Sequence, residues 1–153
     1  MNRIMLFVVA LFACAVVMPT AAAAQALKPF AGNWRGETYG EIAAGKREKL
    51  KCTAYNSLTD SGMKLVVRCA GAAEAIRITA DARENGGKLS GTWKEATFGV
   101  DGTLSGSVDA TSIKGRIASP NFNASVDIVR TASGLTVSLT PTSGSLKFSV
   151  AMK

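Results

Sequence analysis

VDGTLSGSV, at residues 100–108, alternates small or apolar residues with polar ones at every position. Successive side chains of a β-strand point to opposite faces of its sheet, so this pattern predicts a strand with one dry face and one wet face. The same period of two extends to both sides, as in IRITADAR at residues 76–83 and LKFSVAM at residues 146–152. No segment after residue 24 shows a helical period, so the chain is predicted to be all-β.

Runs of turn-forming residues separate these alternating segments, for example ENGG at 84–87 and PTSG at 141–144. Together they predict about ten strands, at residues 30–40, 48–55, 63–70, 74–83, 88–95, 99–109, 112–118, 122–130, 134–140 and 145–152. Short links pair neighbouring strands antiparallel, and one dry face per strand lets the sheet close into an up-and-down β-barrel or fold into a sandwich. We favour the barrel, because closure hides the strand edges that an open sheet would expose.

The first 24 residues have the composition of a cleaved signal peptide. Arg3 supplies a positive start, residues 4–17 are apolar, and the alanines at 21–24 offer the small-x-small pattern that a signal peptidase reads. We therefore expect residues 25–153 to form a single β-barrel domain in the periplasm or outside the cell. As an alternative, LFAC at residues 11–14 resembles a lipobox, which would leave a lipidated Cys14.

Two cysteines remain after residue 24, Cys52 and Cys69. An even number of cysteines in an exported domain indicates a disulfide. A run rich in turn formers, residues 56–62, joins the two predicted strands that carry them. A hairpin centred between Asp60 and Ser61 places Cys52 directly opposite Cys69, within bridging range. We therefore predict a structural disulfide that stabilises the fold by roughly 3 kcal/mol.

A five-residue pattern, large-x-Gly-x-large, occurs at residues 30–34, 89–93, 104–108 and 113–117. In each copy the glycine shares the apolar face with two bulky residues. Glycine at such a position permits the strong coiling that a small barrel requires. Alternatively, the missing side chains leave an internal cavity, and the two interpretations are compatible.

FAGNW, at residues 30–34, resembles the Gly-x-Trp opening of lipocalins and related calycin barrels. The resemblance implies that Trp34 plugs the closed end of the barrel. Lipocalins also stack this tryptophan under an arginine from a late strand, and the last strands here offer Arg130 and Lys147. The predicted strand count is more similar to fatty-acid-binding proteins and nitrobindins. Nitrobindins bind haem through histidine, which this sequence lacks, so haem binding is not carried over.

The same region is also similar to the small periplasmic inhibitors of bacterial metalloproteases. These proteins combine an Ala-Gly-x-Trp opening with one disulfide between early strands, as residues 31–34 and the Cys52–Cys69 pair would do here. This second resemblance implies a protein-binding module that acts through residues 25–29 or through the loops at the barrel rim.

The sequence contains no recognisable catalytic constellation. It has no histidine, which removes the commonest general base and histidine-based metal sites, and both cysteines are assigned to a disulfide. We therefore predict a non-enzymatic protein without a metal or cofactor. Glu95 is in phase with Trp93, and Arg130 with Ile128, so both are candidates to point inward. They could pair, or Arg130 could receive a ligand carboxylate; alternatively, both lie at strand ends and reach water.

The apolar face carries glycines, whose missing side chains leave space in the barrel interior. This pattern favours a binding protein that holds a small hydrophobic ligand or lipid in the barrel lumen. We expect the ligand to contact Trp34, Trp93, Phe122, Arg130 and Phe148. The alternative function is that of an envelope protein-binding module, such as a protease inhibitor.

The net charge of +7 bears on the choice of partner. For an exported protein the anionic partners are lipid head groups, lipopolysaccharide phosphates or an acidic protein rather than nucleic acid, or the charge simply maintains solubility. KREKLK, at residues 46–51, is either a solvated rim or a docking patch for anionic lipid. A membrane-spanning barrel carries a tall band of apolar residues on its outer face. The run of apolar residues along each strand here is too short to form such a band.

Overall fold

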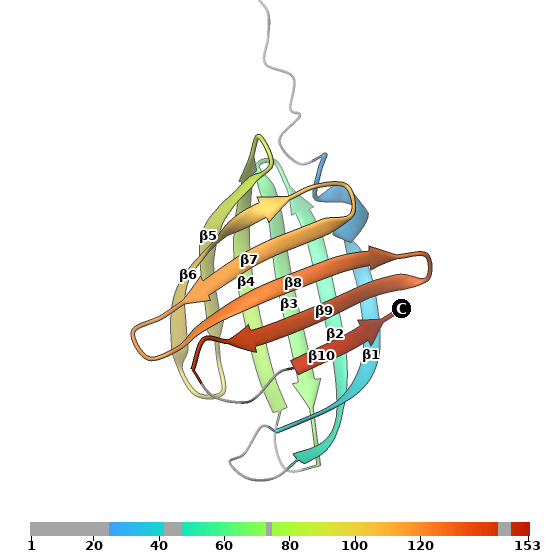
Figure 1. Ribbon diagram of the computed structural model, residues 1–153, viewed down its shortest axis with the longest axis vertical. Helices are drawn as coiled ribbons and strands as arrows, with labels where there is room; N and C mark the ends of the chain where they lie inside the picture. The colour runs from blue at the N-terminus through green and yellow to red at the C-terminus, as the bar shows by residue number, and fades with distance from the viewer. Residues whose placement is uncertain (1–24, 42–46, 73–74, 144–147) are drawn as a thin grey trace, which may run out of the picture.

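The computed structural model describes residues 25–41, 47–72, 75–143 and 148–153. The predicted signal peptide with Cys14 lies outside this part of the chain, as does Lys147. A short 3-10 helix, η1 (Lys28–Phe30), precedes a closed antiparallel barrel (Figure 1). The strands are β1 (Gly32–Glu41), β2 (Arg47–Thr59), β3 (Gly62–Ala70), β4 (Ala75–Asn85), β5 (Lys88–Glu95), β6 (Val100–Val108), β7 (Ser112–Ala118), β8 (Asn123–Thr131), β9 (Gly134–Pro141) and β10 (Phe148–Met152).

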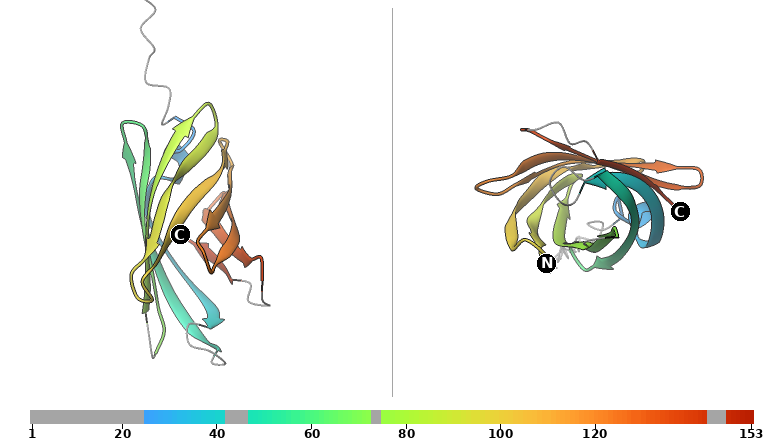
Figure 2. Two further views of the ribbon diagram at one scale, coloured as in Figure 1. Left: turned by 90° about the vertical axis from the view of Figure 1, so that its left-hand side faces the viewer. Right: turned by 90° about the horizontal axis from the view of Figure 1, so that it is seen from below.

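Every strand pairs with its neighbours in the sequence, and β10 returns to pair with β1. The view along the molecule shows the resulting ring (Figure 2). The predicted all-β, up-and-down barrel is therefore confirmed, and the sandwich alternative is wrong.

Several predicted strand boundaries differ from the structure, and two of these differences have a clear physical reason. The link predicted at residues 56–62 is wrong, because β2 continues to Thr59 and pairs with β3 until a tight turn at Asp60 and Ser61. Backbone pairing with a neighbouring strand here outweighs the turn preference of Asn and Ser. At the other end of the domain, the strand predicted from Phe30 begins only at Gly32, because Pro29 lies in the 3-10 turn before it.

The alternation of the sequence places the apolar residues in the barrel interior, where they form two clusters. One cluster surrounds η1 and contains Leu27, Phe30 and Met63. The other surrounds the disulfide and contains Leu50 and Val150. Trp34 packs against both, so the interior is continuous along the barrel.

Cys52 and Cys69 lie directly opposite each other on β2 and β3, with Cα atoms 4.1 Å apart, and their sulfur atoms are bonded. The disulfide predicted from the sequence is therefore confirmed, as is the hairpin register that places it. Both cysteines are buried among the interior residues, so the bond ties two adjacent strands within the core.

Two glycines that face each other on neighbouring strands test whether the recurring glycine permits close strand contact or leaves a cavity. Gly106 on β6 lies opposite Gly115 on β7. A β-carbon on Gly106 would overlap the carbonyl oxygen of Lys114, whereas on Gly115 its nearest neighbour would be the carbonyl oxygen of Ser105 at 3.5 Å. Close approach of strands therefore requires glycine at position 106 but not at position 115.

We expect Gly106→Ala to lower the free energy of unfolding by about 1–3 kcal/mol, the usual cost of forcing an extra carbon into packed structure. Gly115→Ala is the matched control and is expected to change it by less than about 1 kcal/mol. Chemical denaturation of the two variants measures the difference. Equal destabilisation by both substitutions would contradict the assignment of strand contact to Gly106 alone.

Asp109 caps the turn between β6 and β7. Its carboxylate accepts hydrogen bonds from the backbone N–H and hydroxyl of Thr111 and of Ser112, at 2.8–3.0 Å. These donors, the Thr111 backbone N–H first among them, lower the pKa of Asp109 from its ordinary 3.8 to about 2. The ionised carboxylate is thus the form that stabilises the turn.

The stability of this turn should therefore depend on pH. Because the pKa is depressed in the folded state, the contribution of Asp109 is complete above pH 3.8 and is lost as the pH falls through about 2. The difference in unfolding free energy between the wild type and Asp109→Asn should be constant near neutrality and shrink across that window. Denaturation curves at a series of pH values measure it, and a difference that does not change with pH would refute the assignment.

Candidate functional site

The helix η1 seals one end of the barrel. Leu27 and Phe30 have no exposed surface, and both belong to the interior cluster that includes Met63 and Leu135. η1 lies against the upper end of the strands (Figure 1). We call the segment 27–30 the plug.

Backbone carbonyls of the plug are held by side chains of the barrel. The carbonyl oxygen of Phe30 accepts hydrogen bonds from Trp34 Nε1 at 3.1 Å and from Asn56 Nδ2 at 2.9 Å. A buried carbonyl without partners would be costly, so these two donors stabilise the plug in its place.

Arg130, near the end of β8, completes this arrangement. Its guanidinium donates to the carbonyl oxygen of Pro29 and lies over the Trp34 ring, with Cζ 5.5 Å from the ring centroid. An arginine in that position is attracted to the negative face of the indole ring. The calycin resemblance implies an arginine from a late strand stacked on the opening tryptophan. Here Arg130 stacks on Trp34 in this way.

Glu95 does not pair with Arg130. It is buried at the end of β5, where its carboxylate accepts hydrogen bonds from the backbone N–H of Arg77, Thr97 and Phe98 at 2.6–3.2 Å. Burial alone would raise the pKa of Glu95, but the three amides, Phe98 first, lower it below its ordinary value. Its role is to cap the turn into β6, so the pairing with Arg130 considered from the sequence is wrong.

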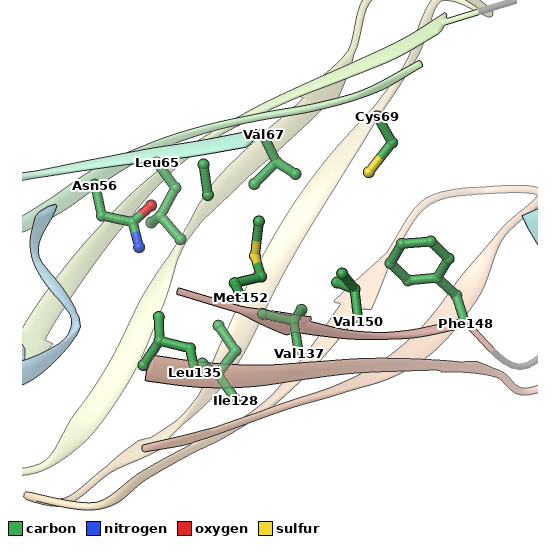
Figure 3. A pocket seen from close by; sticks show the side chains of 11 residues that line it. Asn56, Leu65, Val67, Cys69, Ile128, Leu135, Val137, Phe148, Val150 and Met152 are labelled. Carbon is green, nitrogen blue, oxygen red and sulfur yellow. The ribbon is translucent and has the colours of Figure 1, made fainter. Parts of the chain in front are cut away.

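A cavity of about 50 Å³ occupies the barrel interior between the plug and the opposite end. It is lined by one polar residue and ten apolar ones (Figure 3): Asn56, Ala54, Leu65, Val67, Cys69, Ile128, Leu135, Val137, Phe148, Val150 and Met152. In the close view Asn56 lies at one end of the lining residues and Phe148 at the other. The lining is therefore apolar along the length of the cavity, with one polar group at its plugged end.

The amide of Asn56 is only half satisfied. The side chain is 8% exposed, Nδ2 donates to Phe30, and Oδ1 has no hydrogen-bond partner among the described residues. Rotating the amide by half a turn would set its oxygen against the Phe30 carbonyl oxygen, so the hydrogen bond determines which atom stays unpaired. A buried acceptor without a partner is a position where a donor would be favoured.

Of the five residues predicted to contact a ligand, only Phe148 lines the cavity. Trp34 and Arg130 hold the plug. Trp93 and Phe122 pack edge to face away from the cavity, with ring centroids 6.2 Å apart. The structure thus separates residues that the sequence pattern had grouped.

No known protein-family model matches the chain, and no curated protein is similar to it in sequence. In the part of the chain that the structure describes, no helix has the length and apolar character needed to cross a lipid bilayer. No cluster of three or more Cys, Asp or Glu side chains suited to a metal ion occurs there either.

Sequence reasoning missed Asn56, the polar residue of the cavity. It shares the inward phase of Cys52 and Ala54, but it had been assigned to the turn at residues 56–62. Continuing the alternation one step past Ala54 would have identified an inward-facing amide.

Proposed function

We propose that this chain is a non-enzymatic binding protein that takes a small apolar ligand into its barrel lumen. The observation that carries the proposal is the apolar cavity in the barrel interior, with a single polar side chain in its lining. The carboxylates of Glu95 and Asp109 and both cysteines are already engaged in turns and a disulfide. The buried disulfide also supports export to an oxidising compartment, the periplasm or the outside of the cell.

The size of the cavity limits the ligand. Sites for drug-sized molecules measure about 300–1,000 Å³, whereas this one is about 50 Å³. In this conformation the cavity has room for a ligand of only a few non-hydrogen atoms. A longer hydrocarbon would enter only if Phe148, at the end of the cavity far from the plug, turned out of the lumen.

The polar end of the cavity indicates the ligand's chemistry. Asn56 Oδ1 can accept a hydrogen bond but cannot donate one. A ligand with a hydroxyl group on an apolar body would therefore insert with that hydroxyl toward the plug.

Native mass spectrometry of the purified protein is the first test. Expression of the full sequence and gentle purification should give a protein that carries a small molecule or binds added short-chain alcohols. A protein that stays free of any added apolar compound would contradict the proposal.

The variant Asn56→Leu tests the polar end, since leucine has the same branched shape with four side-chain non-hydrogen atoms and no acceptor. We compare 2-propanol with 2-chloropropane, which has a similar shape and no donor. Loss of one hydrogen bond, about 0.5–1.5 kcal/mol, should lower the alcohol-to-chloride affinity ratio by roughly 2- to 10-fold. NMR titration of the wild type and the variant measures this ratio, and an unchanged ratio would remove Asn56 from the site.

The alternative function, a protein-binding module, depends less on the N-terminal segment than the sequence suggested. Leu27 is fully buried and the Pro29 carbonyl is bound by Arg130. A protein partner would then contact exposed rim residues such as Phe98.

A further inference from the structure

Four basic side chains that are separated in the sequence lie close together on the outer face of β1–β4. Arg68 on β3 lies directly opposite Arg77 on β4, and Arg35 on β1 lies in the same row, separated from Arg68 only by Thr53. Lys51, on β2, is two residues along the strand from Thr53, so it sits diagonal to both Arg35 and Arg68. All four basic side chains are exposed. We call Arg35, Lys51, Arg68 and Arg77 the basic face.

This arrangement has an electrostatic cost. Like charges directly opposite each other on neighbouring strands destabilise a sheet. The residues beside the pair along β3 and β4 are uncharged, namely Val66, Ala70, Ala75 and Thr79. Within the described ranges, the one ion pair closer than 4 Å joins Glu37 to Lys49. Glu37 also lies directly opposite Lys51, so it offsets charge at that edge of the basic face and not at the Arg68–Arg77 pair.

The chemistry of the basic face fits phosphate groups. Guanidinium groups bind phosphate oxygens through two parallel hydrogen bonds, and neighbouring arginines lose their mutual repulsion when anions lie between them. Tyr55 lies opposite Val66 in the adjacent row of the same surface and is 48% exposed. Tyrosine with an apolar ring and a polar hydroxyl is typical of residues that lie at a membrane–water interface.

We propose that the basic face docks on a membrane surface that contains anionic phospholipids. The proposal is independent of the lumen, because every residue involved points away from it. Arg68 and Arg77 at the centre contact the lipid phosphates, and Tyr55 lies at the level of the head groups.

The test uses the double variant Arg68→Gln/Arg77→Gln. Its matched control is Lys114→Gln/Arg116→Gln, which removes the same charge from exposed positions on β7, in the opposite wall of the barrel (Figure 2). Lys114 lies opposite Asp127, so the control positions, unlike Arg68 and Arg77, have an acidic residue directly across the strand pair. Co-sedimentation at low salt with vesicles of phosphatidylcholine and phosphatidylglycerol measures the partition coefficient of each protein.

We expect the Arg68/Arg77 variant to bind these vesicles roughly 30-fold more weakly, because each basic residue near an anionic surface contributes a factor of about 5. The control should lose much less, and vesicles of phosphatidylcholine alone should bind none of the proteins. The variant should also unfold at an equal or higher temperature than the wild type, since a like-charge contact is removed. The proposal would be overturned if the wild-type protein did not bind the anionic vesicles. The same conclusion would follow if both variants lost the same amount of vesicle binding. Binding to an acidic protein with no binding to vesicles would overturn it as well.

Discussion

Phe30→Ala is expected to lower the free energy of unfolding by about 3–5 kcal/mol, the range for removing a large aromatic side chain from a packed core. Phe30 is fully buried in the plug, and it packs in the cluster that also contains Leu27 and Met63. The truncation would leave a cavity at the end of the lumen that the plug closes. Urea denaturation followed by tryptophan fluorescence measures the effect.

Phe98→Ala is the matched control, because Phe98 is 56% exposed on the turn between β5 and β6. We expect this substitution to change stability by less than about 0.5 kcal/mol. A Phe30→Ala protein as stable as the Phe98→Ala protein would show that residues 27–30 do not seal the barrel.

Removing the disulfide by Cys52→Ala/Cys69→Ala is expected to lower the free energy of unfolding by roughly 3 kcal/mol. The bond closes a loop with a sequence separation of 17, and without it the unfolded chain gains conformational freedom. Denaturation of the wild type with and without a reducing agent, and of the double variant, measures the contribution.

The reducing agent supplies the internal control. It should destabilise the wild type by a similar amount and leave the double variant unaffected. If reduction left the wild type unchanged, the two thiols would not be paired in the folded protein, and the placement of β2 against β3 would lose its strongest support.

The architecture could be predicted from the sequence because its signal is local. An alternating strand such as β6 shows its inward and outward residues in the order of the chain itself. A hairpin register follows from its turn, so the Cys52–Cys69 pair could be placed as well. Each of these features depends on residues that are close in sequence.

The candidate site could not be predicted in the same way, because it depends on distant residues. Arg130 meets Trp34 and Pro29 only because the plug inserts into the closed barrel beside β8. The size of the cavity depends on how the side chains of several strands pack against each other. The pairing of Arg68 with Arg77 likewise requires the register of β3 on β4, which alternation within one strand does not reveal.

The most direct test of the lumen proposal is NMR of methyl-labelled methionine under xenon pressure, since apolar cavities take up xenon. Met152 lines the cavity, whereas Met63 is equally buried but does not line it. A dry, accessible lumen predicts a saturable shift of the Met152 methyl resonance and a much smaller one for Met63. Resonances that stay unchanged, or that shift equally without saturation, would contradict the existence of a binding cavity in this barrel.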